Sequence, residues 1–436
     1  MSSVAVPSRG QAEWQDYEMG MFIHYDLNVF MNIRSPGWDH RNYDNWPTAE
    51  IFNPKKLDTD QWMEAAKALG AKYAVLTASH GTGFMLWQSD AYPFGVQQSP
   101  WRRGKGDVVK DFVESCRRYG IKPGLYSHMK VNGEWRVDHP GLVNEGKGGD
   151  PEKQARYAKA KLVAARELWG NYGPLVEVWF DGGTPDPAVV GFDVLPPLRE
   201  LQPDAMVFLS PATTMRWIGN EQGVANYPCW ATVPSVEEAM SWEYRGMHHK
   251  LSSGDPDGAT WLPAECDVPL RKGQWVWSPN EEHLIKPVTE LMDIYYKSVG
   301  RNCNLLVNAN PDADGLIPDA DVKRFKEFGD EIRRRFARSL AKTSGKGTLL
   351  ELPLRSPASI DHAIVMEEIT SGERIREYTL EGKVDGAWKP LSSGQCVGHE
   401  RIEEFEPATV SAVRLRVEKS IAEPLIRRLA VFNTRG

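Results

Sequence analysis

The chain has 436 residues, of which 41% are hydrophobic and 25% are charged, and its formal net charge is −7. This composition is typical of a soluble globular protein and excludes a largely disordered chain. The acidic balance argues against nucleic acid and anionic membranes as partners and favours a small neutral or weakly acidic substrate.

Cysteine usage and the N-terminus narrow the class further. The chain has five scattered cysteines, at Cys116, Cys229, Cys266, Cys303 and Cys396. Because no Cys-x-x-Cys pair exists and the count is odd, we expect neither a metal or redox site nor a disulfide framework. The first ten residues lack the apolar core of a signal peptide. The sequence therefore predicts a cytoplasmic enzyme without cofactor or metal, unless a signal peptide has been removed, and it leaves the oligomeric state open.

Helix patterns alternate with short apolar runs along most of the chain. Residues 58–70 predict a helix that Gly70 ends, and the run 73–76 predicts the following strand; the same unit recurs at 108–127 and at 152–180. Further apolar runs predict strands at 21–25, 206–209, 227–230, 260–263 and 304–307. Alternating helices and eight parallel strands predict a (β/α)₈-like TIM barrel.

The pattern changes near residue 345. Short alternating segments bounded by Gly, Pro or Ser follow, at 349–354, 363–366, 378–384, 410–417 and 426–432. This pattern without helices is typical of a β-sandwich. We therefore expect residues 1–343 to form a catalytic barrel and residues 344–436 a small C-terminal β-sandwich domain. That domain either binds carbohydrate or, as we favour, buttresses the barrel.

Polar side chains follow the predicted strands, at the end of a barrel where catalytic residues lie. The first three strands lead into His24, His80 and His128, and the fourth into Asp181, which precedes a pair of glycines. One such residue alone is more often a turn or cap residue than a catalytic group. Polar residues also follow the fifth strand, at 216–221, and the seventh, at 263–267, and these six polar strand ends together predict an active site. A metal site built from the three histidines is disfavoured, since no His-x-x-x-His spacing supports it.

Asp181 suits the nucleophile of a retaining glycosidase. A strand would hold its carboxylate rigidly, and the glycines after it would let a ligand approach the backbone closely. A retaining enzyme also needs a second carboxyl group, about 5–5.5 Å away, to protonate the leaving oxygen.

Several motifs together resemble the α-L-fucosidase family of retaining glycoside hydrolases (glycoside hydrolase family 29-like). They occur in the family's order and include Met-Gly-Met-Phe-Ile-His at 19–24, Val-Trp-Phe-Asp-Gly at 178–182, Arg-Trp-Ile-Gly-Asn-Glu at 216–221 and Pro-Ala-Glu-Cys-Asp at 263–267. The resemblance covers nearly the whole chain. It implies release of a terminal α-L-fucose, or a closely related α-L-hexose, by double displacement through a glycosyl-aspartate at Asp181. The Gly-Asn-Glu motif implies Glu221 as acid/base, with Glu265 as second choice.

The expected substrate is a small carbohydrate, and aromatic faces that pack against sugar rings are expected in its site. The predicted substrate-binding residues are His24, Asp26, Trp46, His80, Tyr126, His128, Trp179 and Trp217.

The sequence departs from the family pattern around the sugar pocket. Where the family usually has two histidines and an aspartate after its second strand, this chain has His80, Gly81 and Thr82; Asp26 stands where the family usually has glycine. A hydroxyl left unpaired in a dry site costs roughly 1–3 kcal/mol, which is enough to change which sugar binds. We therefore hypothesise an α-L-galactosidase or α-L-glucosidase. The alternative is an ordinary α-L-fucosidase in which His128 refills the space at Gly81.

Two alternatives come from other classes. A carbohydrate-binding pseudo-enzyme would keep the cleft without hydrolysing anything, but retention of Asp181, Glu221 and Glu265 argues against it. A metal-dependent hydrolase would use the histidines at the strand ends, and its activity would be lost on chelation.

Overall fold

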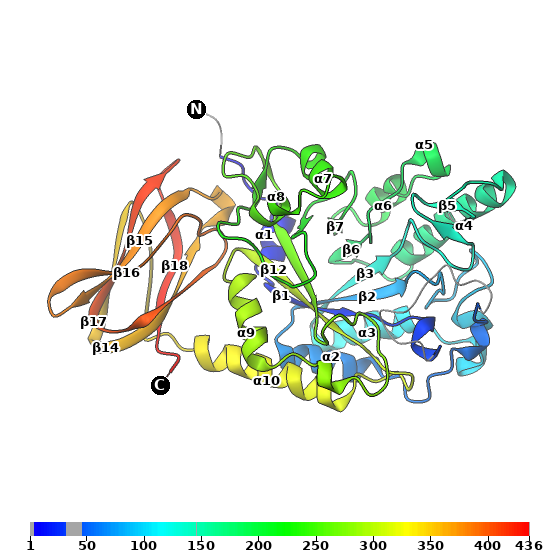
Figure 1. Ribbon diagram of the computed structural model, residues 1–436, viewed down its shortest axis with the longest axis horizontal. Coiled ribbons are helices and arrows are strands. Elements are labelled where there is room, and N and C mark those ends of the chain that lie inside the picture. Colours follow the sequence, from blue (N-terminus) through cyan, green and yellow to red (C-terminus); the bar gives the residue numbers. More distant parts are fainter. Residues whose placement is uncertain (1–3, 32–45, 145, 436) are drawn as a thin grey trace.

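The computed structural model describes residues 4–31, 46–144 and 146–435. A barrel of strands and helices is followed by a C-terminal sheet, which Figure 1 shows at the opposite end of the long axis from α4 and α5. None of the helices in the described part of the chain combines the length and the apolarity needed to cross a membrane.

Eight parallel strands form the barrel. They are β1 (Met19–Ile23), β2 (Tyr73–Ser79), β3 (Lys122–Ser127), β6 (Glu177–Trp179), β7 (Met206–Phe208), β8 (Arg216–Trp217), β11 (Ala264–Pro269) and β12 (Cys303–Ala309). Their order in the sheet is β7-β6-β3-β2-β1-β12-β11-β8. A parallel bridge between Phe208 and Met215 links the two outer strands, so the barrel is nearly closed. The predicted fold class is confirmed.

Two of the eight predicted strands were misplaced. Residues 227–230 form no strand, and β10 (Thr260–Trp261) pairs antiparallel with β9 (Thr232–Val233) outside the barrel. The strands that complete the barrel are β8 and β11. Hydrophobic patterning missed them because β8 has only two residues and β11 carries Glu265 and Asp267 among its apolar positions.

Helices surround the barrel and fill its connections. They are α1 (Arg9–Gln15), α2 (Thr59–Leu69), α3 (Val108–Tyr119), α4 (Pro151–Gly170), α5 (Pro187–Val190), α6 (Leu195–Leu201), α7 (Val236–Tyr244), α8 (His248–Ser253), α9 (Val288–Lys297) and α10 (Asp319–Phe336). Asp58 caps α2 by accepting from two backbone amides, and Gly70 ends it in the left-handed region at φ 100°.

Short elements lie in the loops. They are the 3₁₀ turns η1 (Leu27–Phe30), η3 (Ala49–Ile51), η4 (Val96–Gln98), η5 (Trp101–Gly104), η6 (Glu282–Leu284) and η7 (Ile369–Ser371), and the strand pair β4 (Val137–Asp138) and β5 (Leu142–Val143).

The C-terminal region is one six-stranded antiparallel sheet. Its strands are β13 (Ala341–Lys346), β14 (Leu349–Glu367), β15 (Ile375–Val384), β16 (Ala387–Gly394), β17 (Arg401–Ser420) and β18 (Leu425–Phe432), in the order β13-β18-β14-β17-β15-β16. The predicted boundary between residues 343 and 344 falls inside β13.

Alternation along β14 explains how this sheet meets the barrel. Ala363 and Val365 pack into the sheet's own core, whereas Ile364 and Met366 pack with residues of the barrel core. Successive side chains of a strand point to opposite faces, so one strand serves both cores. This arrangement gives the sheet domain the contact that a buttress needs.

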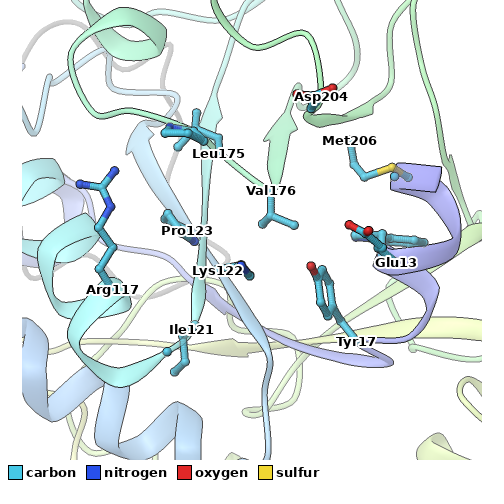
Figure 2. Close-up of a pocket in the computed structure, with 14 residues that line it drawn as sticks. Glu13, Tyr17, Arg117, Ile121, Lys122, Pro123, Leu175, Val176, Asp204 and Met206 are labelled. Atoms are coloured by element: carbon cyan, nitrogen blue, oxygen red, sulfur yellow. The ribbon is translucent and has the colours of Figure 1, made fainter. Parts of the chain in front are cut away.

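A cavity of about 520 Å³ lies at the N-terminal end of the barrel (Figure 2). Its lining includes Lys122, Val176 and Met206, at the starts of β3, β6 and β7, together with Glu13 of α1 and Tyr17. Barrel enzymes carry their catalytic groups at the opposite end, where the strands finish. This cavity is therefore not the candidate active site.

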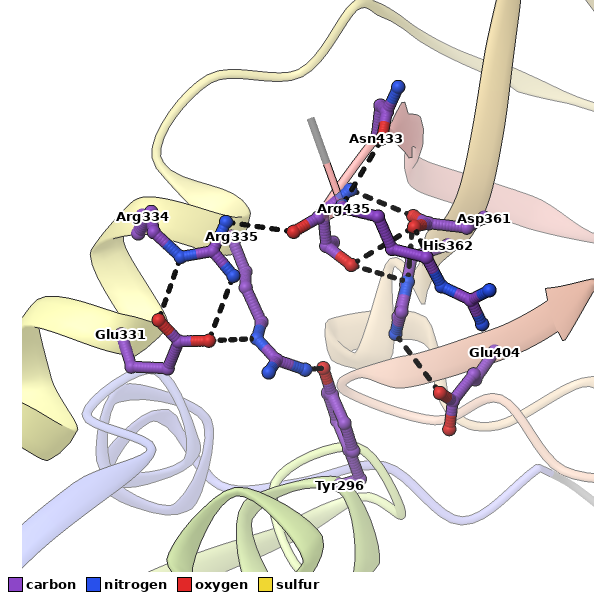
Figure 3. A network of polar contacts seen from close by, with 10 residues as sticks. Tyr296, Glu331, Arg334, Arg335, Asp361, His362, Glu404, Asn433 and Arg435 are labelled. Carbon is purple, nitrogen blue, oxygen red and sulfur yellow. Dashed lines mark hydrogen bonds and ion pairs between the residues drawn. The ribbon is translucent and has the colours of Figure 1, made fainter. Parts of the chain in front are cut away.

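A charged network joins the barrel to the C-terminal sheet (Figure 3). Glu331 of α10 accepts hydrogen bonds from Arg334 at 2.7 Å and from Arg335 at 2.6 Å. These hydrogen bonds, that from Arg334 above all, lower the pKa of Glu331 to about 2. Arg335 also donates to the Tyr296 hydroxyl, and Arg334 to the carbonyl of Thr434 in the C-terminal tail. The network holds the last barrel helix against the sheet domain.

Candidate active site

The Asp181 carboxylate lies just beyond the end of β6. The hydroxyl of Tyr126 donates to its Oδ2 at 2.8 Å, and 44% of the side chain is exposed. The two residues after it, Gly182 and Gly183, have φ of 60° and 80°, and the Gly183 amide donates to the carbonyl of Phe180. Residues other than glycine rarely adopt such backbone angles. The paired glycines are therefore required by the turn that presents Asp181.

Three histidines from the ends of neighbouring strands surround this carboxylate. The rings of His24 and His80 are 5.5 Å apart, those of His80 and His128 are 6.4 Å apart, and His80 stacks on Tyr126. The structure thus brings together four residues that the strand-end rule selected. Among the described residues, no group of three His, Cys, Asp or Glu side chains is placed to hold a metal ion.

The tautomer of His24 follows from its hydrogen bonds. Its Nδ1 lies 2.7 Å from Oδ1 of Asn308, whose amide nitrogen donates to the carbonyl of Trp275 and to Asn310. Since Oδ1 of Asn308 can only accept, Nδ1 of His24 carries the proton and Nε2 is left as an acceptor. Burial lowers the pKa of His24 to about 3, so the ring is neutral at ordinary pH.

His128 has the opposite tautomer. Its Nδ1 accepts from the backbone amides of Lys130 and Val131, at 3.3 and 3.2 Å, so Nε2 carries the proton. Nε2 lies 3.9 Å from Oδ2 of Asp181. Burial lowers the pKa of His128 to about 3. The pocket therefore offers an acceptor at His24 and a donor at His128, which is suitable for binding sugar hydroxyls.

The environment of Asp181 favours its ionised form. Partial loss of hydration opposes ionisation of the carboxylate, but the neighbouring histidines, His128 above all, and the hydrogen bond from Tyr126 outweigh it and lower the pKa of Asp181. A nucleophile must be deprotonated when the substrate binds, and this carboxylate meets that requirement.

Asp26 and Thr82 form a buried pair behind His80. The Thr82 hydroxyl donates to Oδ1 of Asp26 at 2.5 Å, and Oδ2 lies 3.8 Å from Nδ1 of His80. Burial raises the pKa of Asp26, although His80 and Thr82 oppose that shift. Only 2% of Asp26 is exposed. Asp26 therefore lies buried against Thr82 and His80, at the ends of the two neighbouring strands β1 and β2.

We predict that acid weakens the fold through His24 and His128. In the unfolded chain each ring takes up a proton near pH 6.5, whereas in the folded protein its pKa is about 3. Between these values the unfolded state binds more protons, so the free energy of unfolding falls with decreasing pH, by up to about 1.4 kcal/mol per pH unit for each histidine. Urea unfolding at pH 4 to 7 measures this slope.

In His128→Gln, the slope of the free energy of unfolding against pH should correspond to about one bound proton fewer than in wild type. The matched control is His283→Gln, because 69% of the His283 side chain is exposed. A slope that stays the same in His128→Gln would contradict the prediction.

Glu221 lies on an exposed loop after β8. Its Oε2 accepts from the indole N–H of Trp275 at 3.0 Å, and the Trp275 ring lies 5.2 Å from that of His24. The Asn220 side chain bonds to the backbone of Gln222 and Val224 and so fixes the loop. One tryptophan thus connects the first acid/base candidate to the histidine pocket.

Glu265, the second candidate, lies in the barrel interior. It is 1% exposed and accepts from the Tyr73 hydroxyl at 2.6 Å and from the Trp179 indole at 3.1 Å. Burial raises its pKa and that of Glu177, which lies beside it. A leaving group could not reach this position without displacing Trp179.

The three predicted tryptophans occupy different places. Trp179 is stacked between Tyr126 and Phe208, beneath the pocket. Trp217 donates to Asp267 at 2.6 Å near the Glu221 loop. Trp46 packs so closely on Gly133 that a Cβ there would lie 1.9 Å from its ring.

Sequence reasoning missed several polar residues at this end of the barrel. Asn308 follows the predicted strand 304–307 directly, so the strand-end rule could have selected it. Glu243, at the end of α7, has its pKa raised by burial, and Asp181 adds to that shift. Lys130 donates to the carbonyl of Gly182. No motif marks Glu243 or Lys130, because each is brought to the site by a loop or a surface helix.

Comparisons with known proteins place this site in a family. The family model described as alpha-L-fucosidase matches residues 2–334. Alpha-L-fucosidase 1 of Arabidopsis thaliana is 32% identical over 98% of this chain and 87% of that protein. A solved alpha-L-fucosidase homologue from Bacteroides thetaiotaomicron is 42% identical, covers 99% of this chain and 100% of its own, and superposes with a TM-score of 0.93. A Ruminococcus gnavus fucosidase in complex with fucose, 23% identical over 99% and 96% of the two chains, has the same fold with a TM-score of 0.84.

Proposed function

The chain belongs to the alpha-L-fucosidase family of glycoside hydrolases, and from this premise we propose that it is a retaining exo-α-L-fucosidase with Asp181 as its nucleophile. The observation that carries the proposal is the Asp181 carboxylate itself. It has a lowered pKa, is held by Tyr126 and lies among three histidines.

The reaction proceeds in two displacements. Asp181 attacks the anomeric carbon while Glu221 donates a proton to the glycosidic oxygen, and the leaving alcohol departs. Glu221, now a carboxylate, takes a proton from a water molecule, which attacks the same carbon and releases Asp181. The sugar therefore leaves with the anomeric configuration that it had in the substrate.

The Asp26–Thr82 pair supports L-fucose as the glycone. The alternative glycones would need a partner for a hydroxyl that L-fucose does not present, for instance an equatorial hydroxyl or the 6-hydroxyl that L-fucose lacks, and Asp26 is the additional acceptor of this chain. Asp26 is only 2% exposed, and its two carboxylate oxygens lie beside Thr82 and His80. A neutral His24 acceptor and a His128 donor beside Asp181 fit the compensated pocket of an ordinary fucosidase.

We predict that an aryl α-L-fucoside is hydrolysed at least about tenfold faster, in kcat/KM, than the α-L-galactoside and α-L-glucoside with the same leaving group. A buried Asp26 provides no partner for the extra hydroxyl, which would lose its water without compensation. Faster hydrolysis of the α-L-galactoside or of the α-L-glucoside would instead favour that sugar as the glycone. If no glycoside is hydrolysed but L-fucose binds in calorimetry, the protein is a carbohydrate-binding protein.

A further inference from the structure

A groove runs along α7, beside the candidate active site. It has a volume of about 690 Å³ and is lined by Pro211, Ser235, Val236, Glu237, Met240, Ser241 and Tyr244. Val236, Met240 and Tyr244 are spaced four residues apart, so they form a stripe on one face of the helix. The groove therefore has an apolar wall with a few polar groups along it, which is the usual character of a small-molecule site.

Tyr244 lies at the end of the groove nearest Asp181. A Cβ placed on Gly183 would lie 3.2 Å from the Tyr244 hydroxyl, and Gly183 is two residues from the nucleophile. Pro211, on the opposite wall, follows the end of β7 by three residues. The groove thus starts at the turn that presents Asp181 and opens at the active-site end of the barrel.

The Tyr244 ring is held in place but open to solvent. Its exposed fraction is 60%, although it is a large aromatic side chain. Nζ of Lys130 lies 5.1 Å from the ring centre, and the same ammonium group donates to the carbonyl of Gly182. This cation fixes the ring against the nucleophile turn. The ring therefore presents a fixed, exposed aromatic face beside the nucleophile turn, and such a face can pack against a sugar ring.

The position of the groove identifies the part of the substrate that it would receive. The glycone pocket is built from β1, β2 and β3, on one side of Asp181. The groove lies on the other side, between β6, which carries Asp181, and β8, which carries the Glu221 loop. Arg216 of β8 anchors this region, because its guanidinium donates to the carbonyls of Leu251 in α8 and of Trp230. Only the leaving group can extend between a nucleophile and an acid/base in this direction.

We propose that the α7 groove binds the neutral oligosaccharide that carries the glycone, with the Tyr244 ring as the platform for the sugar next to the scissile bond. The inference rests on the proposed function. It predicts that this enzyme distinguishes fucosylated oligosaccharides from simple fucosides through Tyr244, because only the former place a sugar ring on that surface.

The test compares substrates with and without a leaving-group sugar. Wild type, Tyr244→Ala and Tyr244→Phe are assayed on α-L-fucosyl fluoride and on a panel of α-1,2-, α-1,3- and α-1,4-fucosylated trisaccharides. For the trisaccharide that wild type hydrolyses fastest, Tyr244→Ala should lower kcat/KM at least about tenfold more than it does for the fluoride. Tyr244→Phe keeps the ring and should stay within about threefold of wild type.

The matched control is Tyr119→Ala, because Tyr119 is likewise the last residue of a surface helix, α3, but lies far along the outer ring. It should leave both activities unchanged. Equal losses on both substrates in Tyr244→Ala, no loss on either, or a wild type that hydrolyses the fluoride but no trisaccharide would overturn the inference. A wild type that hydrolyses neither substrate would instead overturn the proposed function.

Discussion

Replacing Asp181 with alanine is expected to lower kcat on an aryl α-L-fucoside by roughly 10⁴-fold, because no covalent intermediate can then form. Folding should be little affected, since 44% of the side chain is exposed and its hydrogen bond comes from one partner, Tyr126. The measurement is steady-state hydrolysis together with thermal unfolding of the same preparation.

Azide rescue tests the role of Asp181 beyond simple loss of activity. A small anion can occupy the space left by the carboxylate and attack the anomeric carbon from the same side, so Asp181→Ala with azide should yield the β-L-fucosyl azide. In wild type, the first product observed by NMR should be the α-anomer. The matched control is Asp193→Asn, an exposed aspartate whose carboxylate accepts from the Leu195 amide in a turn. Activity retained in Asp181→Ala, or a β-anomer as the first wild-type product, would contradict the retaining mechanism.

Replacing Tyr126 with phenylalanine is not equivalent to removing the Asp181 carboxylate, and the contacts of Tyr126 show why. The hydroxyl of Tyr126 donates to Asp181, while its ring is stacked between His80 and Trp179. The ring maintains the pocket wall, and the hydroxyl only favours the ionised carboxylate. The side chain was predicted to bind substrate, and in the structure its hydroxyl donates a hydrogen bond to Asp181, the candidate nucleophile.

The sequence predicted those parts of this protein that depend on local patterns. The barrel strands β1, β2, β3 and β6 lie in apolar runs, and Gly70 and Gly120 end helices at left-handed backbone positions. The same reasoning predicted that the residues at those strand ends lie close together, because parallel strands deliver their ends to one face of the barrel.

The parts that could not be predicted depend on tertiary contacts. Strand β8 is only two residues long and is a strand because it pairs with β11. The contacts of Asp26 could not be predicted either, since only the fold shows that its carboxylate accepts a hydrogen bond from Thr82, 56 residues away on the next strand end. Two departures from a family pattern can therefore lie in contact across strands, whereas the sequence shows them only as separate changes.

The choice between the acid/base candidates depends on burial, which the sequence does not show. Glu221 lies in solvent at the rim, whereas Glu265 is enclosed with Tyr73 and Trp179. Two carboxylates in one dry barrel cannot both ionise easily, so the Glu177–Glu265 pair holds a proton for structural reasons. Glu243 is a third carboxyl group, which the fold brings within electrostatic reach of Asp181. Leaving-group dependence distinguishes among these candidates.

Glu221→Ala is expected to lower kcat/KM by roughly 10³-fold or more on fucosylated oligosaccharides, whose leaving alcohol needs a proton. On α-L-fucosyl fluoride the loss in kcat/KM should be much smaller, because fluoride departs without needing a proton. Azide should now trap the glycosyl-enzyme from the opposite face and give the α-L-fucosyl azide, the anomer opposite to that expected from Asp181→Ala. The basic limb of the pH profile of kcat/KM should also disappear, since it reports the acid form of Glu221.

Glu265→Gln and Glu243→Gln are the matched comparisons for the assignment of Glu221 as the acid/base. Glu265→Gln disturbs the hydrogen bonds to Tyr73 and Trp179, so it should lower the melting temperature and slow hydrolysis equally for good and poor leaving groups. Glu243→Gln should show no leaving-group dependence. If either variant, rather than Glu221→Ala, spares the fluoride and yields the α-azide, then that residue donates the proton, and the exposed Glu221 loop only shapes the entrance to the site.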